Sequence, residues 1–385
     1  MVRKHLPWLA AALVLGACRD ETTSGPAAGL APSFHREGGE RQALQFSDWS
    51  PPVNVGAPVN TALIEQGAFI SKDGLSLYFN SPDRPGGFGG IDIWVSQRAS
   101  MDDPWGPPQN LGPTINTASA EAAPVITPDG DELYFFSDRP GGFGGTDIYV
   151  SRRRNKRDDF AWRAAVNLGS GVNTSANELQ AAPFEDDATD ITTLYFNSDR
   201  PGGPGPNDIY ASTLQPDETF GPAVLVAELS TPSNDQQPAI RRDGLELFLA
   251  SNRPGTLGLT DLWVATRAST ADPWSSPVNL GPAINSTVQD GRPALSFDGT
   301  QLYFQSPRPG GLGMFDLYVS MRTRLFQTVL VDPNGRGDGT AKTIQEGITM
   351  VAPGGRVRVM PGTYHEQVTV SKNDLFIVAD IDDDD

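Results

Sequence analysis

One motif, SDRPGGFGGTDIYVSR with small variations, recurs five times along this chain of 385 residues. Its closing aspartates are separated by 55, 61, 53 and 55 residues. A unit of this length cannot bury its own apolar face, so it must pack against further copies of itself. The regular spacing therefore predicts a repeat protein whose units are arranged radially around a common axis.

Each unit contains four strand-like pieces. An outer piece begins at Trp49, Trp105, Trp162, Phe220 or Trp274, and a short strand of small residues follows it. An Asp-Gly turn, present in four units, then leads to a strand of the Leu-Tyr-Phe type. After the glycine loop comes a strand of the Asp-Ile-Tyr-Val type. Four short strands joined by Gly, Pro and Asp turns are typical of a propeller blade. From about residue 49 to 322 the sequence resembles WD-repeat-like propeller repeats of the TolB type.

The number of pieces also predicts how the ring closes. There are five outer pieces and five sets of inner strands, but the chain starts with an outer piece and no outer piece follows the fifth inner set. We therefore expect an all-β, five-bladed propeller of four-stranded blades. The strand near Trp49 should complete the last blade, whose inner strands lie near residues 290–320. Such a closure leaves no open sheet edge.

Residues 1–18 have the pattern of a targeting segment. Arg3 and Lys4 precede an apolar run that is too short to span a bilayer, and Leu15-Gly16-Ala17-Cys18 follows. This segment resembles a bacterial lipoprotein signal, which implies cleavage before Cys18 and a lipid on that residue. The alternative is a plain secretory signal. Residues 19–45 are expected to be a flexible tether, and the resemblance implies an envelope location, at the outer membrane or the cell surface, with membrane contact only through the lipid.

The propeller is expected to span residues 46–324, and the sequence changes character after it. Residues 325–381 contain a strand, a helix near 343–351 and short strands with alternating valines. With Pro361-Gly362-Thr363-Tyr364, they resemble the cap and first coil of pectin-lyase-like parallel β-helices. Asp332, Asn334 and Asp338 resemble part of a calcium loop, although its final glutamate is missing. No other cofactor is expected. Residues 382–385 form a solvated acidic tail.

Two sets of repeated charged residues are the candidate site residues. An arginine opens each glycine loop and an aspartate closes it, and we expect the two to pair and to fix the turn. These pairs are Arg84 with Asp92, Arg139 with Asp147, Arg200 with Asp208, Arg253 with Asp261, and Arg308 with Asp316.

The second set precedes the small-residue strand of each unit and consists of Glu65, Glu121, Glu178, Asp235 and Asp290. Because the innermost strand of a propeller lines its channel, these acids could form a negative ring at one mouth, suited to a metal, a cationic peptide or sugar hydroxyls. Alternatively, each acid could bond the amides of a neighbouring blade.

Composition narrows the functions. A formal charge of −18 argues against a nucleic-acid partner. The three histidines, His5, His35 and His365, lie outside the repeats, so the propeller cannot contain a His-dependent triad. The sequence does not identify catalytic residues. We expect a non-enzymatic envelope lipoprotein that binds a protein or a glycan. The alternative is a carbohydrate-active protein whose active site lies in further β-helix coils.

Overall fold

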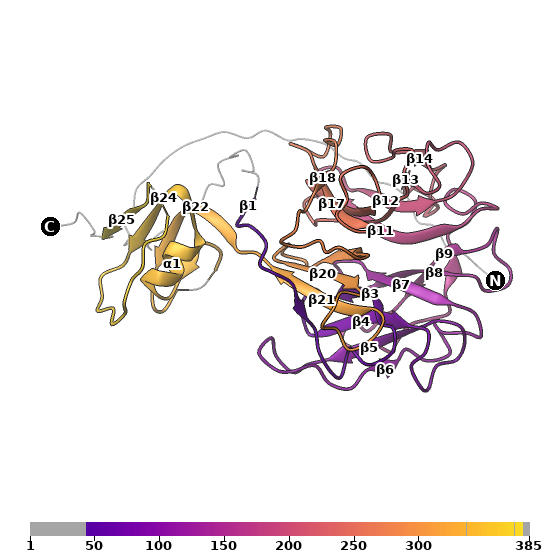
Figure 1. The fold of residues 1–385 in the computed structure, drawn as a ribbon, viewed down its shortest axis with the longest axis horizontal. Helices are drawn as coiled ribbons and strands as arrows, with labels where there is room; N and C mark the ends of the chain where they lie inside the picture. The colour runs from indigo at the N-terminus through magenta and orange to yellow at the C-terminus, as the bar shows by residue number, and fades with distance from the viewer. Residues whose placement is uncertain (1–43, 336, 373, 380–385) are drawn as a thin grey trace, which may run out of the picture. The chain divides into compact units, whose positions relative to one another are not determined.

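The computed structural model describes residues 44–335, 337–372 and 374–379. The signal segment with Cys18, nearly all of the tether and the acidic tail lie outside the described residues. Lipidation and an envelope location therefore stay predictions. The described chain forms five four-stranded sheets and one further five-stranded sheet (Figure 1). No helix among the described residues is both long enough and apolar enough to cross a membrane.

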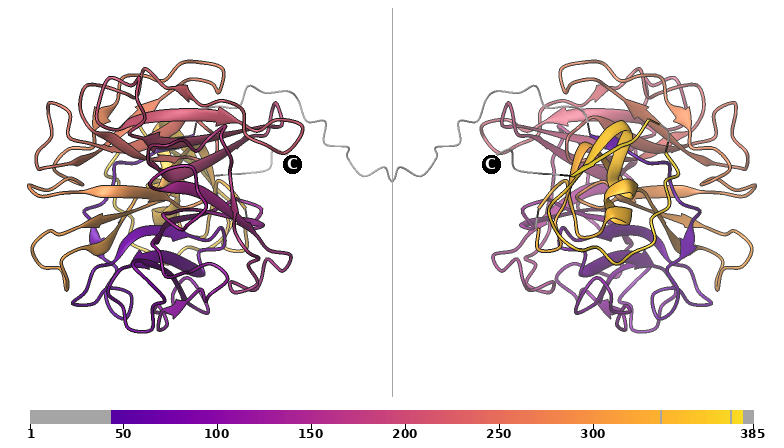
Figure 2. Two further views of the ribbon diagram at one scale, coloured as in Figure 1. Left: turned by 90° about the vertical axis from the view of Figure 1, so that its right-hand side faces the viewer. Right: turned by 90° about the vertical axis from the view of Figure 1, so that its left-hand side faces the viewer.

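The five four-stranded sheets are the blades of a propeller, and every strand pairs antiparallel with its neighbours. They succeed one another around a common centre (Figure 2). From the inner to the outer strand, the first blade contains β3 (Gln66–Ile70), β4 (Ser76–Ser81), β5 (Asp92–Gln97) and β6 (Gln109–Asn110), and the second contains β7 (Glu121–Ile126), β8 (Glu132–Ser137), β9 (Asp147–Arg152) and β10 (Val166–Asn167). The third blade contains β11 (Glu178–Asp186), β12 (Ile191–Ser198), β13 (Asp208–Thr213) and β14 (Val224–Leu225), and the fourth contains β15 (Asp235–Ile240), β16 (Glu246–Ser251), β17 (Asp261–Thr266) and β18 (Val278–Asn279). The fifth blade contains β19 (Gly291–Leu295), β20 (Gln301–Ser306), β21 (Asp316–Met321) and, as its outer strand, β2 (Val53–Asn54).

The closure predicted from the sequence is confirmed. Strand β2 pairs with β21, so that Val53 lies opposite Val319 and Asn54 lies opposite Tyr318. The side chain of Asn60, which is fully buried, donates to the carbonyl of Leu317 at 2.8 Å and accepts from the amide of Leu317 at 2.9 Å. The first segment of the propeller therefore completes the last blade, and each blade has two neighbours.

The apolar core fills the wedges between adjacent blades. Five clusters of buried side chains each join residues of two neighbouring blades, and one of them joins the fifth blade to the first through Leu317 and Phe79. Successive side chains of a strand point to opposite faces of its sheet. Because a neighbouring blade covers each face, the middle strands have consecutive apolar residues, as in Leu77-Tyr78-Phe79, instead of alternating polar ones.

The chain after the propeller forms a sheet with mainly parallel pairing. Strand β22 (Arg324–Val331) pairs in parallel with β23 (Thr340–Ala341) and β24 (Val351–Val359), and β24 pairs in parallel with β25 (Phe376–Ala379). Strand β1 (Gln45–Phe46) pairs antiparallel with β22. The helix α1 (Ile344–Met350) begins at Thr343, which accepts a hydrogen bond from the amide of Glu346. The broader resemblance to β-helix proteins stays a prediction.

Candidate functional site

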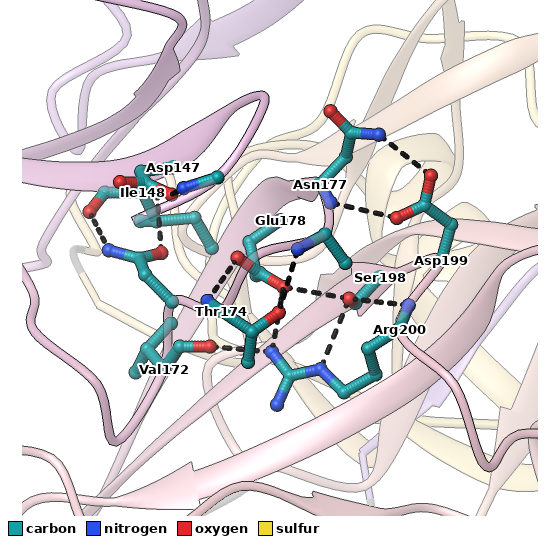
Figure 3. A network of polar contacts seen from close by, with 12 residues as sticks. Asp147, Ile148, Val172, Thr174, Asn177, Glu178, Ser198, Asp199 and Arg200 are labelled. Carbon is teal, nitrogen blue, oxygen red and sulfur yellow. Dashed lines mark hydrogen bonds and ion pairs between the residues drawn. The ribbon is translucent and has the colours of Figure 1, made fainter. Parts of the chain in front are cut away.

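The five acids predicted at the channel mouth form buried ion pairs. Glu178 is fully buried, and its carboxylate accepts hydrogen bonds from the amide and hydroxyl of Thr174, from the hydroxyl of Ser198 and from Arg200 at 3.1 Å (Figure 3). The same ion pair occurs in the other blades, between Glu65 and Arg84, Glu121 and Arg139, Asp235 and Arg253, and Asp290 and Arg308. All five acidic side chains are 0% exposed.

These pairs correct the expected partner of the repeat arginines. Each arginine pairs with the acid that starts or directly precedes the inner strand of its blade, not with the aspartate that closes its own loop. The strand register explains the difference. Glu121 lies opposite Ser137 in the β7–β8 ladder, and Arg139 follows Ser137 by two residues, so its guanidinium reaches Glu121.

The loop aspartates fix the glycine loops without the arginines. The carboxylate of Asp147 accepts the amide of Phe143 at 2.5 Å, the amide of Gly144 at 3.2 Å and the side-chain amide of Asn167 at 2.8 Å. Asp92, Asp208, Asp261 and Asp316 accept loop amides in the same way. The five acids predicted at the channel mouth are fully buried and neutralised by arginines, so they do not present a ring of free negative charge to a ligand.

The central channel of the propeller contains a cavity of about 560 Å³. Ligand pockets for small molecules occupy a similar range of volumes. The five inner strands and the turns that follow them line it, and the lining runs over residues 67–73, 123–130, 180–185, 238–242 and 292–297, together with Arg153 and Lys156. The buried acids and their arginine partners do not belong to this lining. The channel therefore has a different set of candidate residues from the one predicted.

One residue of each inner strand has a positive φ at the level where the cavity begins. These residues are Gly67, Ala123, Gln180, Gln237 and Arg292, with φ between 27° and 60°. The antiparallel register shifts at the same place in all five inner strands. Each inner strand thus contains a β-bulge, which leaves one residue unpaired and re-aims its side chain. We call these five residues the bulge ring.

The bulge ring is asymmetric in its chemistry. Glycine and alanine occupy it in the first two blades, whereas Gln180, Gln237 and Arg292 occupy it in the last three. Gln237 accepts the amide of Arg292 through Oε1 at 2.8 Å. The side-chain amide of Gln180 lies 3.4 Å from the carbonyls of Pro238 and Pro293, and its Oε1 has no hydrogen-bond partner among the described residues.

Arg292 is the unusual member of the ring. Its Nη1 is buried without a hydrogen-bond partner in the described part of the chain, and its guanidinium carbon lies 5.5 Å from the ring centre of Phe136. Because Phe136 belongs to the second blade, the side chain of Arg292 extends across the channel from the fifth. Burial lowers the pKa of Arg292 to about 10. The residue remains a cation at neutral pH, and no acid in the described part of the chain forms an ion pair with it.

Carboxylates lie near the other end of the cavity lining. Burial, and next the negative charge of Asp129, raise the pKa of Glu185, while Arg242 opposes this effect. Burial alone would also raise the pKa of Asp129, but hydrogen bonds from Thr127 and Asp131 outweigh it and hold the pKa below its usual range. Two neighbouring acids of the cavity lining therefore have pKa values displaced in opposite directions.

The calcium candidates have other partners in the structure, and calcium binding stays a prediction. Asp332 accepts the amide of Asn334 at 2.8 Å, and Asp338 pairs with Arg324 at 2.6 Å. Within the described residues, no group of three or more His, Cys, Asp or Glu side chains is arranged to hold a metal ion.

The sequence contains a signal for the position of the bulge ring. Each ring residue follows one of the five acids by two positions, as Arg292 follows Asp290. Aligning the repeats on those acids brings Gly, Ala, Gln, Gln and Arg into one column. The bulge itself gives no signal in a single sequence, so the direction of these side chains could not be predicted.

Several solved structures with a similar backbone are glycoside hydrolases. An α-L-arabinofuranosidase from Lactobacillus brevis is 17% identical, with 74% of this chain and 96% of that chain covered and a TM-score of 0.48. The catalytic domain of a GH62 α-L-arabinofuranosidase from Coprinopsis cinerea is 13% identical, with 72% and 97% covered and a TM-score of 0.46. A GH43_12 protein from a capybara gut metagenome is 17% identical, with 76% and 56% covered and a TM-score of 0.47.

No protein-family model and no curated protein matches the sequence. The TolB-type and pectin-lyase-like resemblances therefore stay predictions. The first functional expectation, a non-enzymatic binding scaffold, is corrected, because the similar solved structures are named as carbohydrate-cleaving enzymes. At these identities the likeness itself describes the fold alone.

Proposed function

We propose that this protein is carbohydrate-active and that a glycan enters the central channel. The observation that carries the proposal is the cavity of about 560 Å³, which has carboxylates in its lining and, at the bulge ring, polar atoms without a hydrogen-bond partner among the described residues. The proposal moves the site from the β-helix coils expected from the sequence to the propeller, because the described cavity lies there.

Glu185 and Asp129 are the proposed acid and base. Glycoside hydrolysis uses two carboxyl groups, one protonated and one ionised. Two acids whose environments displace their pKa values in opposite directions satisfy this requirement. The raised pKa of Glu185 favours its protonated form, and the lowered pKa of Asp129 keeps that group ionised.

The two groups would act on opposite sides of one bond. Glu185 donates its proton to the glycosidic oxygen, and the bond between that oxygen and the anomeric carbon breaks. A water molecule adds to the anomeric carbon, and its proton passes to Asp129. Four charged groups set the pH dependence at Glu185: Asp129, Glu132 and Asp187 raise its pKa, and Arg242 lowers it.

A reducing-sugar assay across a broad panel of polysaccharides tests this proposal. The Glu185→Gln variant should reduce the rate by about 100-fold or more, because a general acid contributes roughly 10²–10⁴-fold. The matched control is Glu228→Gln, which removes an exposed glutamate away from the cavity lining and should keep the wild-type rate. No release of sugar from any polysaccharide by the wild type, or equal rates for wild type and E185Q, would contradict the proposal.

A further inference from the structure

We infer that the channel selects acidic sugars, and that the guanidinium of Arg292 receives the carboxylate of a uronic acid. This inference rests on the proposed function and adds the class of substrate. It follows from the missing ion pair and the backbone conformation of Arg292, from the polar groups around it and from the overall charge of the chain.

Arg292 differs from the other arginines of the cavity lining, each of which has a carboxylate partner. Arg153 pairs with Asp159 at 2.8 Å, Arg241 pairs with Asp243 at 2.6 Å, and Arg242 pairs with Asp187. Among the described residues, Arg292 forms no ion pair, and its guanidinium carbon lies 5.5 Å from the ring centre of Phe136. A buried cation without an acid is costly, and an incoming carboxylate would remove that cost.

The backbone conformation at Arg292 is a second source of instability in the unliganded protein. Its φ of 50° lies in the left-handed region, which disfavours side chains with a Cβ and which glycine adopts freely. The first blade has glycine at the equivalent position, Gly67. Strain of this kind is typical of ligand sites, where the rest of the structure enforces it. The long polar side chain is thus held where a smaller one would be more stable.

The groups beside Arg292 suit a sugar better than a simple anion. The free Oε1 of Gln180 is a hydrogen-bond acceptor in the channel. The carbonyls of Pro238 and Pro293, 3.4 Å from the amide of Gln180, are held only weakly at that distance. Acceptors of this kind recognise hydroxyl groups, and a planar guanidinium binds a carboxylate through two parallel hydrogen bonds. A ligand with one carboxylate and several hydroxyls satisfies both.

The charge of the ligand follows from the number of unpaired cations in the bulge ring. One guanidinium neutralises one negative charge, and the chain as a whole carries a formal charge of −18. A phosphate dianion would bring a second charge that no further free cation of the bulge ring compensates. A uronate is a monoanion at neutral pH, so it matches the single cation of the ring.

Calorimetric titration of the full chain tests the inference. The probes are trisaccharides of galacturonate, glucuronate and mannuronate, the neutral galactose trisaccharide with the linkage of the galacturonate one, and sodium acetate. We expect at least one uronate to bind at least tenfold more tightly than the neutral sugar and acetate. Arg292→Met should abolish this preference, and R292K should retain part of it, because lysine keeps the charge but not the planar fork. Arg157→Met, which removes an exposed charge of the propeller, is the control.

The possible outcomes separate the inference from the proposed function. Neutral sugar bound as tightly as the uronates, or a uronate preference that survives in R292M, overturns the carboxylate site but leaves a carbohydrate-active channel. Acetate bound as tightly as the uronates overturns selection of a sugar. A uronate preference that is lost in R292M while the wild type cleaves no glycan supports the carboxylate site and contradicts the proposed enzymatic function.

Discussion

Replacing Arg292 by methionine should make the protein more stable, against the usual direction for a point substitution. The pKa of Arg292 falls to about 10, more than two pH units below that of a free arginine. At about 1.4 kcal/mol for each pH unit, the charged form costs about 3 kcal/mol in the fold. The contact with Phe136 returns about 0.5–1 kcal/mol. The net gain for R292M is therefore about 2 kcal/mol.

The gain can be measured by denaturant titration and by thermal unfolding at pH 7, where it should raise the melting temperature by roughly 4 °C. The difference between R292M and the wild type should stay constant below pH 9. It should shrink as the pH rises through about 10, because the folded arginine then loses its proton before the unfolded one does. Ala123→Gly controls for the backbone, since Ala123 has a φ of 54° at the equivalent position without a charge. An R292M variant no more stable than the wild type would refute the uncompensated charge.

Three further results are expected. Arg253→Met should destabilise the fold by about 3–5 kcal/mol, because it leaves Asp235 buried and charged; denaturant titration checks this, and D235N/R253M should regain part of the loss. Asn60→Ala should lower the free energy of unfolding by about 1–3 kcal/mol and expose strand β2 to proteolysis, because it leaves the backbone groups of Leu317 unpaired. The control is Asn116→Ala, which removes the equivalent hydrogen bonds to the backbone of Ile93 inside the first blade and should leave β2 protected. The pKa of Glu185 is raised in the fold, so the contribution of Glu185 to stability falls as the pH rises through that pKa. The E185Q variant should therefore be more stable than the wild type at neutral pH and equally stable in acid. A higher stability of E185Q that persists in acid would contradict the raised pKa of Glu185.

The candidate site was predicted only in part. The repeated acids and arginines were recognised as sets, because each occupies a fixed place in the repeat. Their pairing was not, because a period of 55 residues does not tell which of two acids in a blade an arginine reaches. Strand register decides that, and it places Arg139 two residues from the partner of Glu121.

The sequence by itself determined the five blades, their four strands and the closure through Val53 and Asn54, because these follow from counting repeats and from the need to pair every sheet edge. The tertiary structure alone decided which side chains meet in the channel. A bulge in each inner strand turns one residue away from the ladder, and five such residues from distant parts of the chain then form one ring. Neither the positive φ of Arg292 nor its lack of an acidic partner can be inferred from neighbouring letters, since both depend on how strands separated by more than a hundred residues pack around the axis.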